Sequence, residues 1–484
     1  MKLRHPELLR TQSYIGGRWC EFSAPGFDVL NPADGGLVAR VDDAGPEQTR
    51  AAIDAAEKAL PGWQNRTASK RAEILLRWCT LQNRHSADLA QIMTAEQGKP
   101  ISEAEAEIVY GSSYIQWFAE EAKRVYGDVI PPPCGDQRIV VIKQPIGIVA
   151  AITPWNFPNA MLARKVAPAL AAGCTVVAKP AELTPLSALA MAKLGEEAGI
   201  PPGVFNVVCT SRSVEVGKVL CEDSRVRKLT FTGSTATGKK LLAQCAATVK
   251  RTSMELGGNA PFIIFNDADL DLAVDGVMAS KFRNAGQTCV CANRLLVQAE
   301  VYEEFSDRLF ARIRALRLGP GEQPGVDMGP LINQSAVEKV QRIVHDAISK
   351  GATAKAAGLT AEMGPLFADP TMLLNCTPDM AAFREEIFGP IAPLFRFKEE
   401  SEAIALANDV PVGLAAYFYT EDRRRVWRVS ESLQYGIVGI NEAAISNPMA
   451  PFGGVKESGS GREGSKYAID DYLEIKYLCF GSLD

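Results

Sequence analysis

In the first part of the chain, apolar residues recur at intervals of about three and four, which places them on one face of a helix. This spacing predicts amphipathic helices over residues 48–60, 68–83, 89–97 and 101–123. From residue 146 onward the pattern changes to short continuous apolar runs, which are typical of strands buried on both faces. Helical segments separate these runs, and such alternation is typical of a doubly wound parallel sheet. The strands predicted here are 146–152, 174–178, 204–208 and 228–231.

The second half of the chain alternates in the same way. Its strand candidates are 261–265, 295–298, 371–374, 392–397, 414–419 and 437–440. We therefore expect an α/β protein with two doubly wound domains. The first is a Rossmann-type cofactor domain (1–122 and 143–256), and the second is a catalytic domain (257–455). Residues 351–364 are rich in small side chains, so we expect them to be exposed.

Two β-prone segments, 125–130 and 138–143, flank a turn rich in proline and glycine. This arrangement predicts a β-hairpin arm. The second segment alternates little between polar and apolar residues, so a buried strand is the alternative. We assign residues 123–142 and 456–484 to the arm and the C-terminal segment.

Composition narrows the classes of function. The 484 residues suffice for more than one domain, and 47% hydrophobic residues are typical of a soluble globular protein. A net charge of −5 without a basic block disfavours nucleic acid and membrane partners. No apolar run could span a bilayer, and the N-terminus lacks the apolar core of a signal peptide. Eleven cysteines without framework spacing indicate reduced thiols in the cytoplasm, and the scarcity of histidine argues against a metal site.

One cysteine is well placed for chemistry. A helical run over residues 270–284 ends at Ala285-Gly286, and Cys289 follows in a short irregular segment. A nucleophilic thiol needs a base, but no histidine lies in a segment of catalytic character, which disfavours a Cys–His hydrolase. Glu255, at a strand end beside two glycines, could be that base. A cysteine considered alone is more often a buried small apolar residue.

A glycine-rich turn indicates a nucleotide. Gly233 and Gly238 precede two lysines, which is close to a P-loop, but the Ser or Thr that holds Mg²⁺ in that motif is missing. The alternative is a dinucleotide loop, in which a helix N-terminus receives the pyrophosphate. Glu182, after a predicted strand, could accept hydrogen bonds from ribose hydroxyls, or it could be a solvated loop carboxylate.

Two segments taken together are specific. FRNAGQTC, which carries Cys289, resembles the cysteine signature of the aldehyde dehydrogenase superfamily, and MELGGNAP, which carries Glu255, resembles its glutamate signature. The resemblance extends from Tyr14 to Tyr477. Within the superfamily the chain looks most like the succinate-semialdehyde dehydrogenases, on the segments KQPIG, TPWNFP, KFRNAGQTCVCANR, EEIFGP and GREGSKY…DDYLEIKY.

The resemblance implies a mechanism. Cys289 would attack the aldehyde carbon to give a thiohemiacetal, whose oxyanion the Asn156 amide and the Cys289 backbone N–H would hold. After hydride transfer to nicotinamide, Glu255 would activate the water that hydrolyses the thioester. Cys291 could pair with Cys289 as a redox guard, although plain packing is the simpler interpretation. A nucleotide-free thioester or ester hydrolase and a non-catalytic relative are the other classes considered.

The resemblance also implies the ligands. The expected coenzyme is NAD, with NADP weaker, because the NADP-dependent relatives tend to carry Ser where this chain has Glu182. The implied coenzyme residues are Trp155, Lys179, Glu182, Gly233, Ser234, Leu256, Glu386 and Phe388.

For the substrate, Arg164, Arg283 and Ser446 would hold the carboxylate of a short semialdehyde, succinic semialdehyde first and glutarate semialdehyde second. A surface ion pair is the usual role of any single arginine. The arm would pair with a strand at residues 473–477 and build a homo-oligomer, a dimer or a tetramer.

Overall fold

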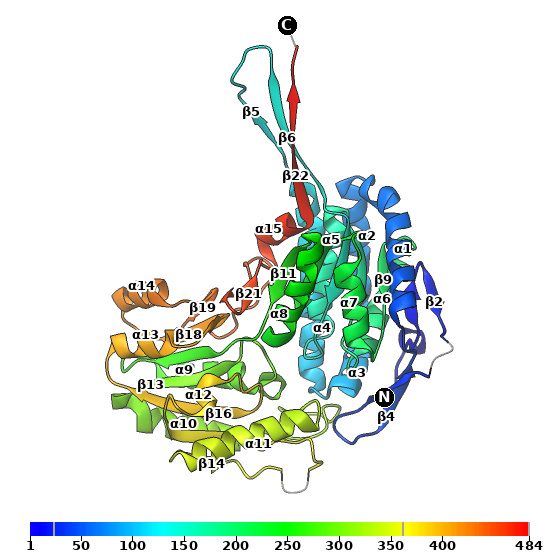
Figure 1. Ribbon diagram of the computed structural model, residues 1–484. Helices are drawn as coiled ribbons and strands as arrows, with labels where there is room; N and C mark the ends of the chain where they lie inside the picture. The colour runs from blue at the N-terminus through cyan, green and yellow to red at the C-terminus, as the bar shows by residue number, and fades with distance from the viewer. Residues whose placement is uncertain (23–24, 361–362, 483–484) are drawn as a thin grey trace.

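The structure is a computed structural model that describes residues 1–22, 25–360 and 363–482. Within these residues the chain folds into two helix-covered β-sheets, and a narrow β arm projects away from both (Figure 1). The predicted α/β class with doubly wound parallel sheets is confirmed. In the part of the chain that is described, no helix is long and apolar enough to cross a membrane.

The first sheet has the strand order β2-β1-β9-β8-β7-β10-β11-β21, with parallel strands from β9 to β11. Its strands are β1 (Ser13–Ile15), β2 (Arg18–Cys20), β7 (Ile148–Ile152), β8 (Thr175–Lys179), β9 (Phe205–Val207), β10 (Val226–Thr232), β11 (Arg251–Glu255) and β21 (Gly459–Ser460). The short C-terminal strand β21 pairs antiparallel with β11, which sequence spacing does not predict.

Helices cover both faces of this sheet, and alternate residues of each strand face opposite sides. Val149 and Ala151 of β7 pack into the core with α2, α4, α5 and α6, whereas Ile148 and Ala150 pack with α1, α7 and α8. The helices are α1 (Pro46–Gln64), α2 (Ala68–Arg84), α3 (Ser86–Gln97), α4 (Ile101–Glu121), α5 (Ala160–Ala172), α6 (Pro185–Ala198), α7 (Ser213–Glu222) and α8 (Thr235–Cys245). The amphipathic helices expected from apolar spacing are confirmed.

The second sheet has the order β14-β15-β16-β13-β12-β18-β19 and is parallel except at β14. Its strands are β12 (Ala260–Ile264), β13 (Ala292–Gln298), β14 (Thr353–Ala356), β15 (Thr371–Cys376), β16 (Ile391–Phe397), β18 (Ala415–Tyr419) and β19 (Ile437–Ile440). The accompanying helices are α9 (Leu270–Val277), α10 (Tyr302–Arg314), α11 (Gln334–Ser349), α12 (Ala381–Arg384), α13 (Glu400–Asn408) and α14 (Arg423–Ser432).

The described residues of the segment 351–364, which was expected to be exposed, are exposed or half-buried except for the buried Ala352. Residues 353–356 form β14, because pairing with β15 satisfies their backbone groups at the sheet edge. Residues 361–362 of this segment lie outside the described residues.

The predicted hairpin arm is confirmed. It consists of β5 (Asp128–Ile130), β6 (Arg138–Pro145) and β22 (Leu473–Phe480), in the order β22-β6-β5 (Figure 1). The alternative of a buried strand is wrong for 138–143, whose residues are half-buried or exposed. The remaining short elements are β3 (Phe27–Leu30), β4 (Leu37–Val41), β17 (Val412–Gly413), β20 (Val455–Lys456), α15 (Ser465–Ala468) and the 3₁₀ turns η1 (Pro6–Leu8), η2 (Ala122–Arg124), η3 (Ala246–Thr248), η6 (Ala299–Val301) and η7 (Ile469–Tyr472).

Candidate active site

The carboxyl ends of four adjacent strands, β8, β7, β10 and β11, hold most of the predicted coenzyme residues. These strands are parallel, so their carboxyl ends meet at one edge of the sheet, where doubly wound folds bind ligands. The residues at this edge are Lys179 at the end of β8, Trp155 and Asn156 after β7, Gly233 and Ser234 after β10, and Glu255 and Leu256 at the end of β11.

The approach to Cys289 is not the continuous helix that the sequence predicts. Helix α9 passes into a π-helical turn, η4 (Met278–Phe282), and then into η5 (Arg283–Gly286). Asn284 and Ala285 have left-handed φ angles of 51° and 54°. Arg283 therefore lies just beyond the helix rather than on it. The break is stabilised from outside, because the Asn284 backbone N–H donates to Glu103 at 2.8 Å.

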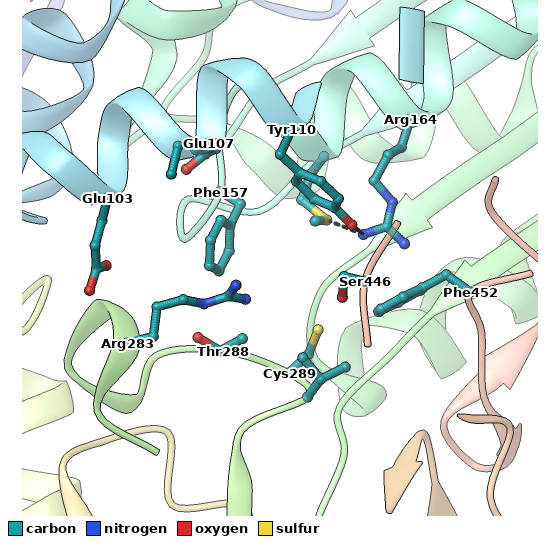
Figure 2. A pocket seen from close by; sticks show the side chains of 13 residues that line it. Glu103, Glu107, Tyr110, Phe157, Arg164, Arg283, Thr288, Cys289, Ser446 and Phe452 are labelled. Atoms are coloured by element: carbon teal, nitrogen blue, oxygen red, sulfur yellow. Dashed lines mark hydrogen bonds between the residues drawn. The ribbon is translucent and has the colours of Figure 1, made fainter. Parts of the chain in front are cut away.

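Cys289 lies where two cavities meet. It lines a cavity of about 180 Å³ and a second one of about 260 Å³. Figure 2 shows its sulfur directed into the first cavity. The predicted substrate residues Arg164, Arg283 and Ser446 line the first cavity. The second is lined by Trp155, Asn156, Gly233, Ser234, Leu256, Glu386 and Phe388. One thiol can thus contact a ligand in each cavity.

Burial controls the ionisation of the two groups with catalytic character. It raises the pKa of the Cys289 thiol to about 12. It also raises the pKa of Glu255 well above its ordinary value, and the negative charge of Glu463 adds to the effect. Among the described residues the Glu255 Oε2 atom has no hydrogen-bond partner. Burial therefore favours the protonated form of both groups.

A buried charge cluster beside the thiol includes a residue that sequence reasoning missed. Glu463 pairs with Lys165 and with Arg164, whose Nε lies 2.7 Å from Glu463 Oε2. Burial alone would raise the pKa of Glu463, but the two cations outweigh it and hold that pKa below its ordinary value. The segment GREGSKY contains Glu463, but nothing in that pattern indicates its partners.

The two arginines of the first cavity differ in whether an acidic side chain is paired with them. Arg164 is 1% exposed, is paired with Glu463, and lies 3.9 Å from the centre of the Phe452 ring. Among the described residues the Arg283 side chain makes no hydrogen bond or ion pair. It lies 5.1 Å from the centre of the Phe157 ring, and the Glu103 carboxyl lines the same cavity. Arg283 points into the cavity between Phe157 and Ser446 (Figure 2). The first cavity therefore offers a cation that no ion pair among the described residues holds.

The second cavity fits a dinucleotide in its charged and polar groups. Ser234 is the N-cap of α8, so backbone N–H groups of a helix N-terminus face this edge. Glu386 accepts from the Gly258 N–H at 2.9 Å, and burial raises its pKa to about 7. Phe388 meets Trp155 edge to face, with 5.7 Å between ring centres.

At the far end of this edge, Lys179 donates to Glu182 at 3.3 Å and to Ser213 at 2.7 Å. Ser213 also donates to Glu182, at 3.2 Å. Sequence reasoning missed Ser213, the first residue of α7, because serine is common near helix starts and does not by itself indicate a ligand. This Lys-Glu-Ser group provides the donors and acceptors that a ribose requires.

Cys291 is buried, and its single S–H can donate to the carbonyl of Lys281, 3.6 Å from the sulfur, or to that of Ala292, 3.5 Å away. These contacts account for a packing role. Its pairing with Cys289 stays a prediction.

Comparison with known proteins agrees with this geometry. Residues 19–478 match the aldehyde dehydrogenase family. The chain is 56% identical to the 3-sulfolactaldehyde dehydrogenase of Pseudomonas putida, covering 100% of both chains. It is also 56% identical to the NADP(+) succinate-semialdehyde dehydrogenase of Escherichia coli, covering 99% of this chain and 100% of the relative. A glutarate-semialdehyde dehydrogenase of Pseudomonas aeruginosa is 55% identical, with 100% of both chains covered. The chain therefore belongs to the aldehyde dehydrogenase family, whose members oxidise aldehydes with NAD(P).

Proposed function

We propose that this enzyme oxidises a short aldehyde that carries a carboxylate at its far end, with succinic semialdehyde as the first choice. The observation that supports this proposal is that the Arg283 side chain, which has no ion-pair partner among the described residues, lines the same cavity as Cys289. Its planar guanidinium can hold a carboxylate through two parallel hydrogen bonds. Ser446 would add a hydroxyl donor. Arg164, already paired with Glu463, would contribute mainly through its free Nη2.

In the proposed reaction Cys289 is the nucleophile, Asn156 holds the oxyanion and Glu255 is the base for thioester hydrolysis. Asn156 Nδ2 donates to the Gln287 carbonyl at 2.9 Å, so the amide lies beside the segment that carries the thiol. Cys289 must lose its proton before it attacks, and Glu255 must lose its own before it activates water. A nicotinamide coenzyme, when bound in the second cavity, supplies the hydride acceptor.

For the coenzyme we propose a preference for NAD over NADP. Glu182 would repel the 2′-phosphate of NADP and compete for its space, while Lys179 offsets part of that repulsion. One relative is named for NADP(+), so family membership leaves the choice open. The test is the ratio of kcat/KM for the two coenzymes in wild type and Glu182→Ser. An unchanged ratio would remove Glu182 as the selector.

The substrate proposal is tested with succinic semialdehyde, glutarate semialdehyde, 3-sulfolactaldehyde and butanal. Loss of a bidentate charged contact costs about 1.5–3 kcal/mol, so Arg283→Ala should lower kcat/KM for the semialdehydes by roughly 10- to 100-fold. The loss on butanal should stay within about threefold. Arg308→Ala, at an exposed ion pair on α10, is the matched control. Equal losses on both substrate types, or a wild type that prefers butanal, would contradict the proposal.

Three further proposals complete this description. Glutarate semialdehyde is the alternative substrate, because Arg283 and Arg164 could also hold the carboxylate of an aldehyde that is one carbon longer.

The domain limits stay as proposed from the sequence, with residues 1–122 and 143–256 for coenzyme and 257–455 for the thiol. The enzyme is proposed to be a cytoplasmic homo-oligomer. A hydrolase without nucleotide is less favoured, and coenzyme reduction on addition of aldehyde distinguishes the two.

A further inference from the structure

A fully buried ion pair lies beside the loop that carries Asn156. The side chains of Lys99 and Glu107 are both 0% exposed, and Lys99 Nζ lies 2.6 Å from Glu107 Oε2. Lys99 follows α3, and Glu107 lies on the face of α4 that borders the first cavity (Figure 2). The reaction proposed above gives this pair no role.

The pair holds both ends of one short segment. Lys99 Nζ donates to the backbone carbonyl of Asn156 at 2.8 Å, and Asn284 Nδ2 donates to the same carbonyl at 3.1 Å. Glu107 Oε1 accepts from the backbone N–H groups of Asn159 at 2.9 Å and Ala160 at 3.1 Å. Residues 156–160, from the oxyanion amide to the first residue of α5, are therefore fixed by two charged side chains.

Stability alone does not account for this pair. Two well-packed apolar side chains often stabilise a core as much as a buried ion pair does. Apolar residues would not donate a hydrogen bond to the Asn156 carbonyl, however. That bond sets the orientation of the peptide, and the peptide sets the direction of the Asn156 side chain. A catalytic group displaced by 1 Å can cost about 10²-fold in rate.

We propose that Lys99, held by Glu107, is a positioning residue that fixes the Asn156 carbonyl and so directs the Asn156 amide at the oxyanion formed on Cys289. This inference rests on the proposed role of Asn156. Lys99 lines neither cavity, although its Nζ lies 4.0 Å from the centre of the Phe157 ring. Its main effect on the reaction passes through the Asn156 amide.

The test compares Lys99→Met in two backgrounds, wild type and Asn156→Ala. The measurements are the rate of the first turnover of reduced coenzyme in a stopped-flow experiment and the coenzyme Kd. In the wild-type background Lys99→Met should lower the first-turnover rate by about 10- to 100-fold, with the Kd changed by about twofold or less. In the Asn156→Ala background the further loss should also be about twofold or less.

Lys228→Met is the matched control, since Lys228 is another 0% exposed lysine, and it bonds Ser253 in the first sheet away from both cavities. It should leave the first-turnover rate near that of wild type. A wild-type rate in Lys99→Met, or an equal loss in both backgrounds, would overturn the inference. If Asn156→Ala itself keeps the wild-type rate, the oxyanion role in the proposed function fails instead.

A lone Glu107 could prevent folding of Lys99→Met, because an unpaired buried charge is strongly destabilising. The double variant Lys99→Met/Glu107→Gln removes both charges and keeps an acceptor for the α5 N–H groups. It should fold and show the same fall in first-turnover rate. A folded double variant with the wild-type rate would also overturn the inference.

Discussion

Glu386 and Glu255 are carboxylic acids whose pKa values are raised by burial, to about 7 for Glu386 and well above the ordinary value for Glu255. Their surroundings differ. Glu386 lines the second cavity and accepts one backbone N–H, whereas Glu255 lies beside the charge of Glu463. Glu386, with a pKa of about 7, is therefore a group whose charge changes within the usual range of assay pH.

Coenzyme affinity should rise with pH across neutrality. Below about 7 Glu386 is protonated, and above it the carboxylate can accept charge-assisted hydrogen bonds from ribose hydroxyls. If coenzyme binds only the ionised form, its Kd falls by up to about tenfold per pH unit below the pKa. Calorimetric titrations at pH values of about 6, 7 and 8 measure this. Glu386→Gln should flatten the dependence, and an unchanged slope would assign it to another group.

Cys291 allows a test of the redox guard. Peroxide would oxidise the Cys289 and Cys291 thiols to one disulfide, a bond that is strained at this spacing and therefore easily reduced. Activity lost to peroxide should return with dithiothreitol in wild type. In Cys291→Ala no such pair can form, so Cys289 would oxidise to states that dithiothreitol does not reduce, and less activity would return. Equal recovery in both proteins would remove the idea.

The turn from β10 into α8 places a helix N-terminus against the second cavity, and close packing fixes its position. A Cβ added at Gly238 would lie 2.5 Å from the Leu256 side chain, which lines that cavity. Overpacking typically costs about 1–3 kcal/mol. Gly238→Ala should therefore displace Leu256 and raise the KM for coenzyme by about tenfold, with little effect on kcat.

Gly217→Ala is the control for this element. Gly217 is also a helical glycine, on α7, but its added Cβ would meet only Leu241 at an ordinary 3.8 Å. It should leave the kinetics unchanged. Initial rates at varied coenzyme concentration decide the matter, and a normal KM in Gly238→Ala would show that α8 and Leu256 adjust freely.

The arm formed by β5, β6 and β22 projects away from the rest of the molecule (Figure 1). It exposes large apolar side chains, among them Ile475 at 71% and Tyr477 at 60%. Exposed apolar residues on an unpaired edge strand are typical of a surface that another chain covers. Replacement of both by Glu should lower the oligomer mass measured by light scattering, whereas Ile348→Glu on α11 should not. An unchanged mass in the double variant would exclude β22 from the interface.

Sequence patterns predicted the elements of this molecule well, because helix and strand periodicity depend on neighbouring residues. The helices of the first half, the alternation of strands with helices and the β arm all follow from local spacing. The segments around Cys289 and Glu255 indicated the reaction class before any contact was known. Where local pattern failed, as at Arg283, a distant residue was responsible: Glu103 accepts the N–H of Asn284 and stabilises the break in the helix.

The sequence by itself determined the α/β class, the thiol, the carboxylate and the family, since these depend on residue type and order. Only the tertiary structure decided which charged side chains have an ion-pair or hydrogen-bond partner. Glu463 pairs with Lys165 across 298 residues, and Lys99 reaches the Asn156 carbonyl across 57. The physical reason is burial: removal from water makes every charge depend on the partners that the fold brings to it. That is why Arg164 pairs with Glu463, while the Arg283 side chain has no ion-pair partner among the described residues.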